Sequence, residues 1–158
     1  MADYCTLDLQ GRSYAVDLDC LREVIEPPLL TPVPLAPAGV RGVVNLRGEL
    51  LPVLALDSLL DLQTPESAMA RRPWMAVLQN GSHTFGILAG GVGTVKNAEM
   101  EAPADGQGDH SLIEGLLAIA GPKPAVLNLT ALMRQLRQNL HEITSFQNFS
   151  LNQEPTLP

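Results

Sequence analysis

Aromatic residues make up only 4% of this 158-residue chain, and basic residues are also few. Ten Lys and Arg stand against 17 Asp and Glu, which gives a formal net charge of −7. A protein that binds nucleic acid needs a basic surface that releases phosphate counterions, and single strands also need aromatic rings for base stacking. The composition therefore argues against nucleic acid as a partner, and equally against an anionic membrane surface.

Cysteines and long apolar runs are scarce as well. Cys5 and Cys20 are the only cysteines, and their spacing fits neither a zinc site nor a disulfide framework. No apolar run approaches 18 residues, and the N-terminus lacks the basic and apolar regions of a secretory signal. We therefore expect a cytoplasmic protein that does not insert into the membrane, with both cysteines in its core.

Signatures of catalysis are missing too. His83, His110 and His141 have no second ligand at metal-binding spacing, and no serine or cysteine stands in a nucleophile motif. The glycine-rich stretch 90–93 is not followed by the Lys-Ser/Thr of a phosphate loop. The sequence thus predicts no catalytic residue, no metal and no cofactor. An enzyme whose site is assembled across the fold is the remote alternative.

Short alternating runs bounded by turn residues dominate the chain, and they predict a mainly β protein. A proline-rich connector, residues 31–37, separates two of the predicted hairpins. In the second of these hairpins Gly48 is free to adopt the positive φ that a tight turn requires. The expected strands cover residues 4–9, 13–16, 21–25, 40–46, 50–56, 74–78 and 84–88.

An internal repeat is the most informative feature. Residues 42–48 and 52–56 recur at 115–121 and 125–129, an offset of 73, while Leu21 and Val24 align with Val92 and Val95 at an offset of 71. Each half, about 1–65 and 72–137, therefore predicts a small five-stranded barrel, and the two barrels pack together because neither is large enough to bury its own apolar surface. The predicted core positions are Leu46, Val53, Leu54 and Leu56 in one barrel and Ile119, Val126, Leu127 and Leu129 in the other.

The end of the chain changes character. Apolar residues recur at helical spacing over about 130–144, which predicts an amphipathic helix that closes a domain spanning residues 1–145. The polar remainder, residues 146–158, is expected to be a flexible tail. The apolar stripe of the helix consists of Leu132, Met133, Leu136, Leu140 and Ile143.

Arg47 stands at the tip of an Asn-Leu-Arg-Gly turn, where an arginine can anchor an interface through its planar guanidinium. The stretch from Pro34 to Leu54, which contains this turn and the Pro-Val that follows, resembles the CheW family of chemotaxis coupling proteins. The resemblance extends from about Tyr4 to Leu136. It implies two five-stranded SH3-like β-barrels that share a hydrophobic seam, and no catalysis.

The resemblance also implies partners: a CheA-like histidine kinase, bound through its regulatory domain, and the cytoplasmic tip of methyl-accepting chemoreceptors in arrays at the inner membrane. A CheW-fold module that binds an unrelated signalling protein is the alternative. Departures at Ala55, Gly90 and Ala120 leave the pathway open, whether chemotaxis, pilus motility or phototaxis. The implied partner-binding residues are Leu21, Glu23, Gly42 and Arg47, together with Met75, Val92 and Val95 along a groove between the barrels.

Overall fold

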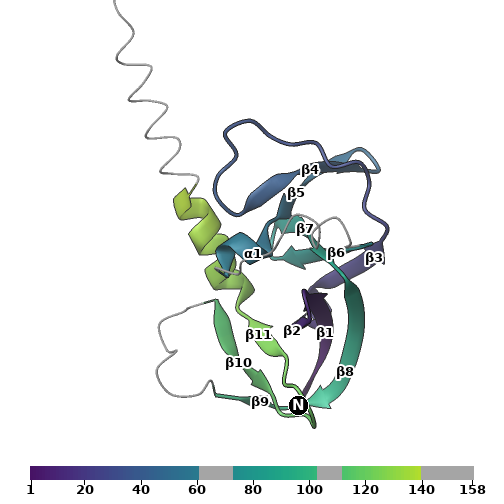
Figure 1. Ribbon diagram of the computed structural model, residues 1–158, viewed down its shortest axis with the longest axis vertical. Helices are drawn as coiled ribbons and strands as arrows, with labels where there is room; N and C mark the ends of the chain where they lie inside the picture. The colour runs from purple at the N-terminus through teal and green to yellow at the C-terminus, as the bar shows by residue number, and fades with distance from the viewer. Residues whose placement is uncertain (61–72, 103–111, 140–158) are drawn as a thin grey trace, which may run out of the picture.

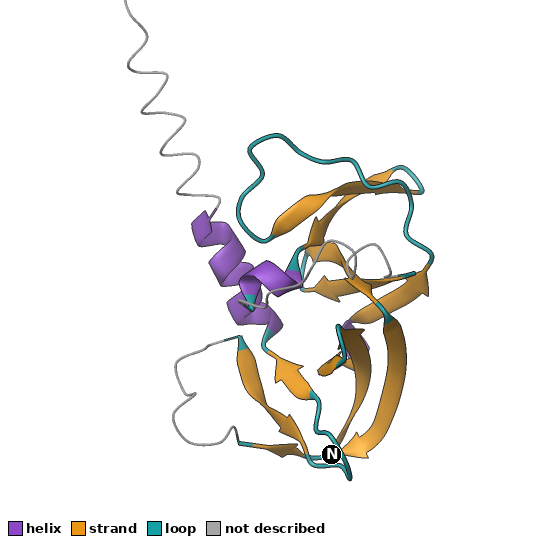
Figure 2. Cartoon of the chain, in the orientation of Figure 1, coloured by secondary structure: helices purple, strands orange, loops and turns teal. Residues whose placement is uncertain are grey.

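Two β-sheets form most of the molecule, as the computed structural model shows for residues 1–60, 73–102 and 112–139 (Figures 1 and 2). The prediction of a mainly β fold is confirmed. The strands are β1 (Ala2–Leu9), β2 (Arg12–Asp17), β3 (Leu21–Ile25), β4 (Val40–Leu46), β5 (Glu49–Leu54), β6 (Trp74–Asn80), β7 (His83–Ala89), β8 (Gly91–Ala98), β9 (Met100–Glu101), β10 (Ile113–Leu117) and β11 (Ala125–Leu127). Two short helical elements, η1 (Leu18–Cys20) and α1 (Leu56–Leu59), join them.

The sheets do not coincide with the two halves of the repeat. The six-stranded sheet has the order β8-β1-β2-β11-β10-β9, and the five-stranded sheet has the order β3-β6-β7-β5-β4. The β1–β2 hairpin of the first half thus lies among strands of the second half, and the β6–β7 hairpin of the second half lies among strands of the first. The expectation that each half forms its own barrel is wrong in this respect, because the two halves exchange their hairpins.

The exchange follows the repeat residue by residue. In the five-stranded sheet Val53 pairs with Gly86 in a parallel bridge between β5 and β7. In the six-stranded sheet Val126 pairs with Ala15 in a parallel bridge between β11 and β2. Val126 is the repeat equivalent of Val53, and Ala15 that of Gly86, so the two sheets are built by one pairing rule applied twice. The strand order in each runs from edge to edge, so the SH3-like barrels are not closed by backbone pairing of the described strands.

The core lies mainly between the sheets. Leu54, Leu56, Leu127 and Leu129 all belong to one central cluster, so these predicted core residues are buried but shared by both halves. Leu46 and Val53 are buried inside the five-stranded sheet and Val126 inside the six-stranded sheet, as expected. Ile119 is only partly buried, which corrects its prediction as a core residue.

A helix at residues 129–139, the yellow-green helix of Figure 1, packs against this central cluster. The side chain of Asn128 caps it by accepting a hydrogen bond from the Ala131 amide at 3.0 Å. Leu132 is buried and Leu136 half-buried, as the amphipathic pattern predicts. The Asn139 amide donates to the Ala38 carbonyl at 2.8 Å and so ties the helix to the connector before β4.

The rest of the predicted stripe, Leu140 and Ile143, and the predicted tail at residues 146–158 lie outside the described residues. Within the part of the chain that the structure describes, no helix has the length and apolar character needed to cross a membrane.

Candidate protein-interaction surface

The β4–β5 hairpin ends in a tight turn that places Arg47 at its tip. Arg47 and Gly48 both have positive φ, 51° and 85°, which is the geometry of a two-residue type I′ turn. The Asn45 side chain supports the turn by accepting a hydrogen bond from the Gly48 amide at 2.8 Å. The positive φ predicted for Gly48 is therefore confirmed, and Arg47 adopts the same left-handed conformation.

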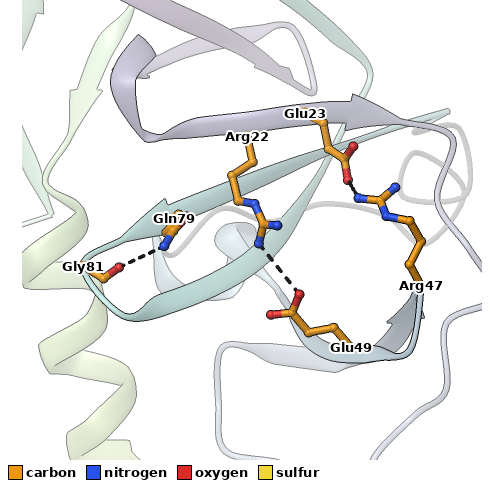
Figure 3. A network of polar contacts seen from close by, with 6 residues as sticks. All are labelled: Arg22, Glu23, Arg47, Glu49, Gln79 and Gly81. Carbon is orange, nitrogen blue, oxygen red and sulfur yellow. Dashed lines mark hydrogen bonds and ion pairs between the residues drawn. The ribbon is translucent and has the colours of Figure 1, made fainter.

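Two ion pairs connect this hairpin to the edge strand β3, as Figure 3 shows. The Arg47 guanidinium donates to the Glu23 carboxylate, and Arg22 approaches Glu49 at 3.8 Å. These contacts bridge the edge of the five-stranded sheet that backbone pairing leaves open. Exposed ion pairs contribute about 0–1 kcal/mol each, so the bridge orients the turn more than it stabilises the fold.

A β-bulge in β3 makes the Glu23–Arg47 contact possible. Leu21 pairs with Leu78 and Glu23 with the preceding residue, Val77, so one extra residue stands between them. The bulge turns Glu23 to the face that carries Val77, which is also the face toward the hairpin tip. Arg22 and Glu49 were not among the predicted site residues. For Arg22, the bulge breaks the alternation from which the direction of a side chain is inferred.

The equivalent strand of the other sheet, β8, has no such bulge at this place. Val92 pairs with Leu7, and the next residue, Gly93, pairs with Thr6. Gly93 therefore occupies the position of Glu23, and Ile25, rather than Val24, corresponds to Val95. This corrects the alignment of Val24 with Val95. Since Ala120 replaces Arg47 in the repeat, the ion pair has no counterpart in the six-stranded sheet.

The other partner-binding residues implied by the resemblance are less exposed than Arg47. Leu21 and Val92 are half-buried against the central cluster, and Val95 is half-buried against the cluster of the six-stranded sheet. Gly42 is buried, and a Cβ there would be 2.5 Å from the Thr31 carbonyl oxygen, so a side chain would displace the neighbouring backbone. The structure thus brings Glu23 and Arg47 into contact, and it places Leu21 and Val92 against the central cluster and Val95 against the cluster of the six-stranded sheet.

Met75 requires a correction. It is fully buried among Val44, Val53 and Val77, and its side chain fills the space beside Gly86. Met75 therefore does not line an exposed groove between the barrels. It occupies this place because odd-numbered residues of β6 face the interior of the five-stranded sheet.

Two thiols and one phenol of the described residues have shifted pKa values. Cys5 lies in the core as predicted, whereas Cys20 is only partly buried, which corrects its prediction as a core residue. Burial raises the pKa of Cys5 and of Cys20, and the nearby Asp17 and Asp19 raise that of Cys20 further. Burial likewise raises the pKa of Tyr14. A raised pKa keeps a thiol protonated and a poor nucleophile at neutral pH. Among the described residues no group of three or more His, Cys, Asp or Glu is placed to hold a metal ion.

Comparison with known proteins supplies the family. The CheW-like domain model matches residues 3–137. The chain belongs to the CheW-like family. This CheW-like chain is 32% identical over 115 residues to the chemotaxis protein CheW of Rhizobium meliloti (strain 1021), which covers 70% of the chain and 73% of the relative. It is 33% identical over 124 residues to protein FrzA of Myxococcus xanthus, covering 73% and 75% of the two chains.

The fold has a solved counterpart. The crystal structure of the scaffolding protein TtCheW from Thermoanaerobacter tengcongensis matches with a TM-score of 0.70, covering 80% of this chain and 88% of that one. The sequence identity is 18%, so this likeness supports the fold alone. The SH3-like architecture that the family resemblance implied is therefore confirmed.

Proposed function

We propose that this chain is a non-catalytic adaptor of a bacterial chemotaxis signalling system. In this role it couples a CheA-like histidine kinase, through the regulatory domain of the kinase, to the cytoplasmic tip of methyl-accepting chemoreceptors. The family match over residues 3–137 supports the adaptor role. It acts in the cytoplasm, recruited to receptor arrays at the inner face of the membrane.

The proposed coupling role is supported by a chemical difference between the two hairpin ends that are equivalent in the repeat. One end presents the ion-paired Arg47 and Glu23, and the other presents Ala120 and Gly93 at the same places. A symmetric molecule would offer the same surface twice and bind one kind of partner. Two chemically different ends on one rigid core are suited to holding two different proteins together.

The receptor contact is assigned to the charged end. Arg47 is the anchor, since 64% of its side chain is exposed and its planar guanidinium can pair with a partner carboxylate. Glu23 orients it, and Gly42 acts through its backbone, whose close packing against Thr31 fixes the edge of the sheet. Leu21 on β3 adds to this contact, and Val92 and Val95 remain proposed partner-binding residues on β8 of the six-stranded sheet. Met75 is left out because it is buried.

The kinase contact lies on a separate part of the molecule in this proposal. Coupling then requires only that both contacts form in one complex, so modest affinities at each are reinforced by the high effective concentration that the first contact creates.

A three-component pull-down tests the coupling. The chain, the kinase regulatory domain and a receptor-tip fragment are mixed, and we expect each partner to be retained when the other is saturating. An Ala120→Ser variant, altered at the uncharged hairpin tip, serves as the control for the receptor arm and should retain the fragment fully. Displacement of the kinase domain by saturating receptor fragment would show overlapping sites and end the bridging model. Retention of neither protein would reject the function itself.

A further inference from the structure

The C-terminal helix, residues 129–139, belongs to the second half of the repeat, yet it contacts the backbone just before β4 in the first half (Figure 1). The contact is made at Gly39. A Cβ there would lie 2.6 Å from Leu59 of α1 and 3.0 Å from Leu136 of the helix, so these two side chains fill the space that a side chain at Gly39 would need. One residue earlier, the Ala38 carbonyl accepts the hydrogen bond from the Asn139 side chain at 2.8 Å.

The second half of the repeat provides an internal reference for this contact. The Ala55 amide donates to the Gly39 carbonyl at 2.7 Å, and at the equivalent place the Asn128 amide donates to the Leu112 carbonyl at 2.8 Å. Leu112 is buried in the central cluster, so the backbone before β10 is anchored by its own side chain. Gly39 has no side chain, and the first half instead takes its anchor from the helix, through Leu136.

The backbone so anchored is the end of a stiff and mostly exposed stretch. We call residues 26–39, between β3 and β4, the strap. None of its residues 26–38 is fully buried. It is held at one place by Leu30 and Thr31, which contact the five-stranded sheet, and at its end by Ala38 and Gly39. Five of its 14 residues are proline, whose rings restrict the backbone, so a displacement at one end is transmitted toward the other.

The strap covers the strand that leads to the charged end. Thr31 and Val43 of β4 exchange two backbone hydrogen bonds of 2.9 Å each, and the Thr31 carbonyl lies over Gly42. Arg47 stands at the tip of the same hairpin, four residues after Val43. The position of the strap therefore bears directly on the edge of the sheet that presents Arg47.

The end of the helix is held weakly enough to detach. Residues 131 and 132 are buried, but no residue of the stretch 133–139 is fully buried. Elements with few buried contacts and exposed hydrogen bonds open locally at a small fraction of the global unfolding free energy. The helix end thus has two states, docked at Gly39 or detached from it.

We propose that docking of the C-terminal helix at Gly39 regulates the receptor contact of the charged end. The docked helix holds the strap on β4, and the detached helix loosens the strap and with it the edge that carries Arg47.

The inference rests on the proposed function, which assigns the receptor tip to the charged end. A receptor tip that binds the ordered edge more tightly than the loosened one favours the docked helix. Because such coupling is reciprocal, weakening the dock must lower the affinity for the receptor tip, although the altered residues lie on a different element.

Two variants weaken the dock in different ways, and a third is their control. Asn139→Ala removes the hydrogen bond to Ala38, and Leu136→Ala removes the side chain that fills the space at Gly39. Gln138→Ala alters an exposed neighbour on the same helix. Titration calorimetry with the receptor-tip fragment measures the affinity of each variant in the full chain.

Hydrogen exchange followed by NMR measures the strap itself, without any partner. The reporters are the Thr31 and Val43 amides, which form the bridge between the strap and β4. The Ala118 amide is the internal reference, because it bonds the Glu99 carbonyl at 2.8 Å on the corresponding edge of the six-stranded sheet.

We expect both dock variants to accelerate exchange of the two bridge amides by about threefold or more, the scale of one lost hydrogen bond, and to weaken receptor binding by about twofold or more. The reference amide should keep its rate, and Gln138→Ala should match the parent in both measurements.

Unchanged exchange of the bridge amides in both dock variants overturns the proposal. Equal acceleration at the reference amide overturns it as well, since the loss would then be global. Faster exchange with unchanged receptor affinity shows a structural contact without regulation; the proposal fails and the proposed function stands. If the parent itself does not bind the receptor tip, the proposed function is wrong and the regulation of that contact falls with it.

Discussion

The two sheets of this protein share one strand topology but differ in a β-bulge and in several exposed side chains. Both place an exchanged hairpin between an edge strand and a parallel neighbour, with equivalent residues in register. The five-stranded sheet carries a bulge in β3, an ion-paired Arg47 and an exposed Leu50. At these three places the six-stranded sheet has a regular pairing, Ala120 and Lys123. The shared parts are those that folding requires, so the differences mark where function is expected.

Hairpin exchange also explains why the repeat does not make two domains. Each half supplies the outer strands of one sheet and the central hairpin of the other, so neither half contains a complete sheet. Leu54 of the first half and Leu127 of the second lie in the same cluster. We therefore infer that the described residues fold as one cooperative unit.

The largest expected effect comes from truncating this shared core. Leu54→Ala and its repeat equivalent Leu127→Ala should each lower the free energy of unfolding by about 2–5 kcal/mol, because both leave a cavity in one cluster. Chemical denaturation measures the loss. If the halves were independent barrels, the two variants would destabilise separate transitions.

Cooperativity can be checked in the same titration. Trp74, the single tryptophan, reports on the five-stranded sheet, and circular dichroism reports on both sheets. Coincident transitions from the two signals are expected in the parent and in both variants. A fluorescence transition separate from the circular dichroism transition would contradict the single unit.

A smaller loss is expected at two equivalent glycines. A Cβ at Gly42 would be 2.5 Å from the Thr31 carbonyl oxygen, and one at Gly115 would be 2.3 Å from the Glu101 carbonyl oxygen. Gly42→Ala and Gly115→Ala should each cost about 1–3 kcal/mol of stability, since the outer backbone segment must move away. Thermal or denaturant unfolding measures the cost.

Gly91→Ala is the matched control for these variants. A Cβ at Gly91 would meet only the Asp8 side chain, at an ordinary 3.7 Å, so its stability should change by no more than about 0.5 kcal/mol. Equal stability of the Gly42, Gly115 and Gly91 variants would show that the backbone at Thr31 and Glu101 can move away from the added methyl group without a cost in stability. In that case the close backbone approaches at Gly42 and Gly115 would not contribute to the free energy of unfolding.

The smallest effect on stability, and a specific one on binding, is expected at Arg47. Arg47→Ala should change the free energy of unfolding by less than about 0.5 kcal/mol, as an exposed ion pair allows. Under the proposed function it should weaken binding of the receptor tip or the kinase domain by about 1 kcal/mol or more. Titration calorimetry measures the affinities. Unchanged affinity for both proteins would remove Arg47 from the interface.

Much of this architecture could be read from local sequence patterns. The strands, the turn at Gly48 and the helix after Asn128 follow from alternation, glycine placement and helical spacing, which are properties of neighbouring residues. The burial of Leu54 and Leu127 followed from the same patterns. Arg47 could be selected because it stands at a turn tip in a chain with few cations.

Other features were beyond such patterns because they depend on contacts between distant segments. The expected groove position of Met75 failed because the direction of its side chain depends on the pairing of β6 with β3 and β7. The pairing of the connector with β4 was also missed, because the bridge from Thr31 to Val43 joins residues that are twelve positions apart in the sequence.

The sequence by itself determined the repeat, its constant offsets and the divergence of Arg47 from Ala120. Only the tertiary structure decided that the halves exchange hairpins and that a bulge brings Glu23 to Arg47. The physical reason is that an alternating pattern fixes which side of a strand is apolar, but not which strand lies beside it. That choice is made by long-range backbone hydrogen bonds and by close approaches such as Thr31 over Gly42, which form only when the whole sheet assembles.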